Sequence, residues 1–151
     1  MAEIALLSAG AKIGYAVATE GDTRPTQGYT TLPNVTSLPS LDQAPNMIDV
    51  TRLSALKYTE KIVGLIDSGD SFGITANLTD EFVAAWDTLT TAAKGKTVFF
   101  CIEFKGMKKA FYFRGDPQPL GTGGAEPNQA LKITANIAIE TMVGWDASPT
   151  A

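Results

Sequence analysis

Apolar and polar positions alternate with a period of two along most of this chain, and a period of two predicts β-strands. Five such segments are rich in β-branched and aromatic residues and end at Gly, Pro, Asn or Asp. They are residues Ile13–Ala18, Ser71–Asn77, Thr97–Phe104, Ala110–Arg114 and Leu131–Val143. The pattern therefore predicts a protein built mainly of β-strands.

The last of these segments, LKITANIAIETMV, predicts a long strand with two unlike faces. One face is dry and would carry Leu131, Ile133, Ala135, Ile137, Ile139, Thr141 and Val143. The other is largely polar and would carry Lys132, Thr134, Asn136, Ala138, Glu140 and Met142. Such a strand covers a core on one side and meets water or a partner on the other.

A helical period occurs once, over residues 79–94, TDEFVAAWDTLTTAAK. Thr79 suits the N-cap, and Asp80 and Glu81 complement the positive end of the helix dipole. The apolar stripe comprises Phe82, Ala85, Trp86, Leu89 and Ala93, and Lys94-Gly95 ends the helix. One helix among five or more strands predicts a mainly β (α+β) fold, a β-sandwich or small barrel of two sheets flanked by the helix.

Two long, proline-rich segments interrupt the strands. Residues 21–45 carry four prolines and are expected to hold irregular or edge-like strand. Residues 116–128 carry three more prolines and include Gly121-Thr122-Gly123-Gly124, which lacks the preceding strand and following helix of a phosphate-binding loop. Long loops in a compact domain are commonly functional, and we expect these to make assembly contacts.

Composition narrows the possible functions. The chain has 151 residues, a net charge of -4 and no histidine, so the commonest general base and metal ligand is missing. We expect one domain over residues 1–151, with no cofactor, metal ion or catalytic site. The absence of a basic cluster argues against tight phosphate binding. The single Cys101 lies in the apolar run VFFCIEF, and the short apolar start of the chain predicts a soluble protein without a leader or membrane span.

One short motif suggests chemistry. Residues 64–71, GLIDSGDS, contain the Asp-Ser-Gly of an aspartic protease, and a retropepsin-like homodimer would use Asp67 from each subunit. However, Asp70 follows Gly69 where that family has Ala or Ser, and FYFRGDPQP does not match the family's later element. Asp, Ser and Gly also favour a turn, so the alternative is a hairpin turn joining IVGLI to SFGITAN.

A larger constellation resembles the major tail tube proteins of bacteriophages with long, non-contractile tails. It consists of a glycine-containing start leading into a strand, a Ser/Thr/Pro segment with spaced apolar residues, an Ile-Asp-Val-Thr element, a Gly-Leu-x-Asp-x-Gly turn and a strand before the helix. These are residues 10–17, 32–41, 48–51, 64–69 and 72–77, and the resemblance spans about residues 8–145. Tube proteins of contractile injection systems and of type VI secretion would share the fold and are a second possibility.

The resemblance implies a structural protein rather than an enzyme. Six subunits would form a ring, and rings would stack around a tape measure protein into a hollow tube that delivers DNA. Other partners would be the tail terminator and the distal tail or baseplate proteins. The protein would be assembled in the bacterial host cytoplasm and would reside in the tail of the virion.

The resemblance also suggests where subunits meet. Residues 43–69 would form an inter-ring loop or hairpin, with Arg52, Lys57, Glu60 and Lys61 as contacts. Residues 1–11 would form an N-terminal arm that orders on a neighbouring ring, and residues 146–151 a short tail. We further expect Asn136 and Glu140, on the polar face of the last strand, to line the channel.

Overall fold

The computed structural model describes residues 10–18, 23–67 and 71–149. Its elements are β1 (Lys12–Val17), β2 (Thr30–Thr31), β3 (Val35–Ser37), β4 (Ala44–Asp49), β5 (Lys61–Asp67), β6 (Ser71–Asn77), α1 (Asp80–Ala92), β7 (Val98–Glu103), β8 (Lys109–Pro117) and β9 (Lys132–Ala147). The proposed N-terminal arm lies almost wholly outside the described residues.

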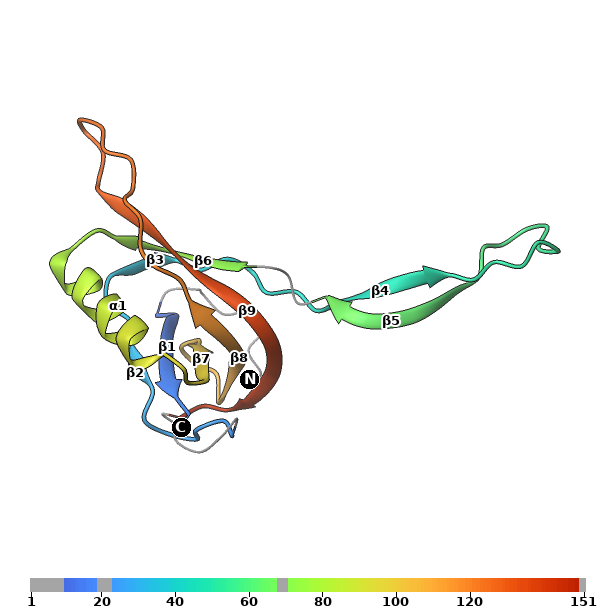
Figure 1. Cartoon of the computed structure of the whole chain (residues 1–151), viewed down its shortest axis with the longest axis horizontal. Helices are drawn as coiled ribbons and strands as arrows, with labels where there is room; N and C mark the ends of the chain where they lie inside the picture. The colour runs from blue at the N-terminus through green and yellow to red at the C-terminus, as the bar shows by residue number, and fades with distance from the viewer. Residues whose placement is uncertain (1–9, 19–22, 68–70, 150–151) are drawn as a thin grey trace.

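Seven of the strands form one antiparallel sheet in the order β2-β1-β7-β8-β9-β6-β3. The sheet curls into a half-barrel, and α1 lies at its open side (Figure 1). Strands β4 and β5 form a separate two-stranded sheet that projects away from the half-barrel. The expected mainly β fold with two sheets, one helix and a hairpin extension is confirmed.

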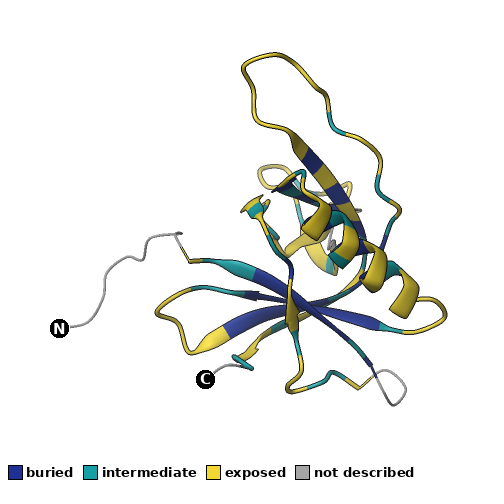
Figure 2. Cartoon of the chain, turned by 90° about the vertical axis from the view of Figure 1, so that its left-hand side faces the viewer, coloured by how far each residue is buried: buried dark blue, intermediate teal, exposed yellow. Residues whose placement is uncertain are grey.

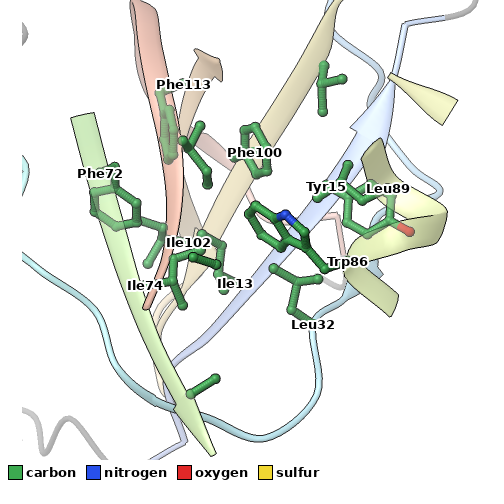
Figure 3. Close-up of a cluster of buried hydrophobic side chains, with 14 of the residues drawn as sticks. Ile13, Tyr15, Leu32, Phe72, Ile74, Trp86, Leu89, Phe100, Ile102 and Phe113 are labelled. Carbon is green, nitrogen blue, oxygen red and sulfur yellow. The ribbon is translucent and has the colours of Figure 1, made fainter. Parts of the chain in front are cut away.

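The core fills the hollow of the curled sheet (Figure 3). The rings of Phe100 and Phe113 stack with centroids 5.3 Å apart, and Phe72 contacts Phe113 at the same distance. Burying one such side chain contributes about 1.5–3 kcal/mol. Residues from β1, β6, β7, β8, β9 and the helix all enter this one cluster, so it holds the two halves of the sheet together.

The helix closes the core through the stripe that its sequence predicts. Phe82, Trp86 and Leu89 are buried, and the Thr79 hydroxyl accepts a hydrogen bond from the Phe82 amide at 3.2 Å. Trp86 also donates its indole N–H to the Gln118 carbonyl at 2.8 Å. This bond ties the helix to the start of the long 118–131 loop.

Two irregularities in β9 correct the predicted alternation. Strand β9 has one extra residue relative to β8 at Glu140 and another at Val143, so the register shifts at both positions. Each added residue moves the following side chains to the opposite face. Met142 therefore packs on the core, Val143 is exposed and Thr141 is exposed, contrary to the expected faces.

The end of β9 also lies later than expected. The strand continues through Ala147, so Asp146 belongs to the strand rather than to a short tail beginning at residue 146. Gly144, with φ +104°, supplies the backbone conformation that lets the strand resume after the second irregularity.

The predicted turn at Asp67 is a further correction. Asp67 is the last residue of β5 and pairs with Ala44 of β4, whereas β6 pairs with β9 and β3. The runs IVGLI and SFGITAN therefore belong to different sheets and do not form a hairpin with each other. Residues 68–70, which connect them, lie outside the described residues.

Candidate assembly surfaces

The β4–β5 hairpin exposes apolar side chains that the described part of the chain leaves uncovered. Each residue of β4 is exposed. In the tip loop, residues 50–60 between β4 and β5, Leu53 and Leu56 are fully exposed, at 106% and 100%. The other large apolar side chains exposed on the hairpin are Met47, Ile48, Val50, Tyr58, Ile62, Val63, Leu65 and Ile66. An apolar surface of this extent marks a site of contact with another molecule.

Hydrogen bonds hold the tip loop in shape at the neck of the hairpin, where residues 49–52 lie beside residues 60–61. The Asp49 carboxylate accepts from the backbone N–H of Thr51 at 2.9 Å and from its hydroxyl at 2.5 Å. The Thr51 hydroxyl oxygen in turn accepts from the Glu60 amide at 2.8 Å. These bonds to Thr51 hold the pKa of Asp49 below its ordinary value.

The four predicted inter-ring residues lie on this hairpin. Arg52 and Glu60 come together as an ion pair across the neck, with Nε 2.9 Å from Oε1. Lys57 lies in the tip, its Nζ 5.2 Å from the centre of the Tyr58 ring, and Lys61 begins β5 opposite Asp49. Leu53 and Leu56 were not among the predicted contacts, because their spacing in the sequence follows neither a strand period nor a helical period.

The two predicted channel residues lie on the outer face of β9. Asn136 is exposed and sits opposite Gly73 of β6, where a side chain Cβ would come within 3.2 Å of the Asn136 amide oxygen. Glu140 is exposed at the first irregularity of β9 and forms an ion pair with Arg114, Nε to Oε2 3.0 Å. The remaining side chains here, such as Thr75 and Thr134, are mostly small and polar.

A second buried cluster lies on the outer face of β7 and β8. Cys101, Ala110 and Tyr112 form it, and the half-buried Tyr29 covers it with its ring 5.6 Å from that of Tyr112. Burial raises the pKa of the Cys101 thiol to about 12 and that of Tyr29 to about 12, and it also raises the pKa of Tyr112. These groups are therefore neutral and unreactive at neutral pH.

The described residues contain neither a metal-binding cluster nor a helix that could span a membrane. No three or more Cys, Asp or Glu side chains among residues 10–18, 23–67 and 71–149 are grouped so that they could hold a metal ion. In the same part of the chain, no helix has the length and apolar character needed to cross a membrane.

Comparisons with known proteins give a likeness of fold only. No family model matches the sequence, and no curated protein matches it. Among solved structures, a chain in the cryo-EM structure of the anti-feeding prophage baseplate, six-fold symmetrised, superposes with a TM-score of 0.64. The match has 10% sequence identity and covers 94% of this chain and 95% of that chain. Nearly the whole of this chain, hairpin and half-barrel together, therefore shares its fold with a chain of that baseplate.

Proposed function

We propose that this protein is a structural subunit of a phage-type tail tube. Six copies form a ring, and rings stack around a tape measure protein into the hollow channel through which the genome passes. In this proposal the protein resides in the virion tail after assembly in the bacterial host cytoplasm, and tail terminator and distal tail or baseplate proteins bind the ends of the tube.

The observation that carries the proposal is the exposed apolar hairpin. An isolated two-stranded hairpin is only marginally stable in water, and one with apolar residues on its surface gains stability by packing against a partner. A structural subunit whose hairpin is covered by other copies meets this requirement. The likeness to a chain of a six-fold symmetrised baseplate supports a six-membered ring.

The edges of the curled sheet support the same proposal. Strand β3 pairs with β6 only at Thr75 and Ala76, so the 71–74 part of that edge has no neighbouring strand among the described residues. At the other edge, β2 pairs with β1 only at Gly14 and Tyr15. Edges of this kind are aggregation sites in a monomer, whereas joining them around a ring satisfies their backbone groups.

The outer face of β6 and β9 suits a channel for DNA. Its side chains are mainly Ser, Thr and Asn with one lysine, Lys132, and the charge of Arg114 there is balanced by Glu140. A wall without a cluster of unpaired cations does not hold phosphates tightly, so DNA can slide past it. We therefore assign Asn136 and Glu140 to the channel wall and Arg52, Lys57, Glu60 and Lys61 to the contact between rings.

Electron microscopy of the purified protein tests the proposal. We expect rings or hollow tubes with six-fold end views to appear as the concentration rises. The double variant Leu53→Ser/Leu56→Ser should stay folded, because both side chains are fully exposed, but should lose the assemblies. The matched control is Met107→Ser, an exposed apolar residue in the turn between β7 and β8, which should assemble normally. Assemblies that survive the double variant would contradict the role of the hairpin.

A tube or baseplate subunit of a contractile injection system is the second candidate, and the likeness to the anti-feeding prophage baseplate favours it. The two candidates differ in the surroundings of the tube. Antibody labelling of particles that contain this chain would show a bare flexible tail in the first case and a tube inside a contractile sheath in the second.

A further inference from the structure

The end of the molecule opposite the hairpin carries a groove between α1 and the first part of the 118–131 loop. Its volume is about 850 Å³. Its apolar walls come from Leu78, Val83, Trp86, Ala93, Leu120 and Ile133. Figure 2 looks onto this end of the molecule, with the helix and the loop turned toward the viewer.

We propose that this groove receives the hairpin tip of a second copy of the chain. The inference rests on the proposed stacking of rings and adds to it the surface on which the tip docks. The contact is head to tail, because the hairpin and the helix α1, which lines the groove, lie at opposite ends of the long axis (Figure 1). A head-to-tail contact between two copies leaves one groove and one hairpin tip free, so along the axis of the tube it continues from one layer of subunits to the next.

The shapes and polarities of the two surfaces match. The tip projects Leu53 and Leu56 from a loop whose neck is held by the hydrogen bonds of Asp49 and Thr51. A protruding loop with two apolar side chains fits a concave apolar site. Because its neck is already ordered, the tip loses little conformational freedom when it docks.

The charges of the two surfaces are also complementary. The tip and its neck carry three cations, Arg52, Lys57 and Lys61, against the two carboxylates of Asp49 and Glu60. The groove carries the exposed carboxylates of Asp87 and Asp116 against the single ammonium of Lys94. A positive tip is therefore attracted to a negative groove, and salt should weaken the attraction.

A second apolar groove is less suitable for the tip. It has a volume of about 420 Å³ and lies where residues 38–43 approach Phe104, Phe111 and Trp145, next to the start of β4. This places it at the root of the hairpin rather than at the opposite end of the molecule. Of its lining residues only Asp42 is charged, so it offers less attraction to the tip.

Cross-linking between copies tests the inference directly. In a Cys101→Ala background, one batch of full-length protein carries Leu56→Cys and a second carries Thr90→Cys, which lines the groove on α1. We expect oxidation of the mixture to give a mixed disulfide at least about tenfold faster than random encounters between the two copies would, because docking raises the effective concentration of one thiol near the other. The matched partners for comparison are Ser40→Cys, at the hairpin-root groove, and Lys108→Cys, in the turn between β7 and β8.

Charge reversal gives a second readout. Adding Lys57→Glu to the copy with Leu56→Cys should slow its cross-linking to Thr90→Cys. Adding Asp87→Lys to the copy with Thr90→Cys should then restore the rate. Lys108→Glu, in the copy with Leu56→Cys, is the control and should leave the rate unchanged. Faster cross-linking to Ser40→Cys, or equal rates with all three partners, would overturn the inference. Electron microscopy of the same samples tests the proposed function separately. Rings or tubes that form without the cross-link to Thr90→Cys would refute the docking site and leave the proposed function standing.

Discussion

The guanidinium of Arg24 joins two parts of the chain that are 122 residues apart: Nη2 lies 2.5 Å from the Asp146 carboxylate. The same guanidinium lies over the ring of Tyr112, 4.1 Å from its centre. Arg24 thereby fastens residues 24–29, including Tyr29, onto the cluster that contains Cys101. We call residues 24–29 the strap.

Removing this fastening should expose Cys101. We expect Arg24→Ala to destabilise the strap by about 1 kcal/mol, since it removes a cation–π contact and a partly exposed ion pair. Local opening then becomes about fivefold more frequent, and Cys101 should react about fivefold faster with a thiol reagent. Arg52→Ala, which removes an ion pair on the hairpin, is the control and should leave the rate unchanged. An unaltered rate in Arg24→Ala would show that the strap does not protect the thiol.

The same cluster predicts a loss of stability at alkaline pH. The thiol of Cys101 has an ordinary pKa of 9.0, raised to about 12 in the folded protein, so only the unfolded chain ionises between these values. Its contribution to stability is full below pH 9.0 and is lost as the pH rises toward about 12. Urea unfolding measured at intervals across this range should show the decline. In Cys101→Ala the onset should move to about pH 10, where tyrosines begin to ionise; an unchanged onset would exclude the thiol as its cause.

The hairpin neck should loosen in acid. Asp49 has an ordinary pKa of 3.8 that is lowered in the folded protein, so its bonds to Thr51 stabilise the neck above pH 3.8 and are lost as the pH falls through the lowered value. NMR should then show weaker protection of the Thr51 amide against hydrogen exchange. The Asp49→Asn variant should have weak protection at every pH, and a Thr51 amide that stays protected in acid would contradict this role of Asp49.

The return of the 118–131 loop to the sheet depends on Gly123. A Cβ at this position would overlap the carbonyl oxygen of Lys132, at the start of β9, and a backbone atom cannot yield as a flexible side chain can. We expect Gly123→Ala to cost about 1–3 kcal/mol in the free energy of unfolding, as overpacking does. Gly124→Ala, where a Cβ meets nothing within 4 Å, is the matched control and should be neutral. Equal urea midpoints for the two variants would refute the close approach.

Local signals in the sequence were sufficient to predict α1 and most strands. Thr79, the two acidic residues after it and the buried stripe act within about four turns of one helix, so no distant part of the chain is needed to recognise them. The strand over residues 71–77 was predicted at its observed bounds, because its two-residue period reflects a buried face along its whole length.

The pairing of the strands could not be predicted from local signals. The segments on either side of Asp67 look like two arms of a hairpin, yet β5 pairs with β4 and β6 with β9. A local turn preference favours the nearest partner, whereas the observed pairing depends on which strand buries its face in the half-barrel. Leu53 and Leu56 were missed for a related reason, since apolar residues in an exposed tip follow no core-facing period.

Local period, capping and composition were thus enough to predict the class of the fold and its helix, whereas the segment that projects as the hairpin was predicted only from the resemblance to tail tube proteins. The tertiary structure decided the two irregularities that turn Met142 inward, the fastening of Arg24 to Asp146 and the groove facing away from the hairpin. Each of these requires residues far apart in the chain to meet, and their meeting is set by how the whole sheet curls around one core.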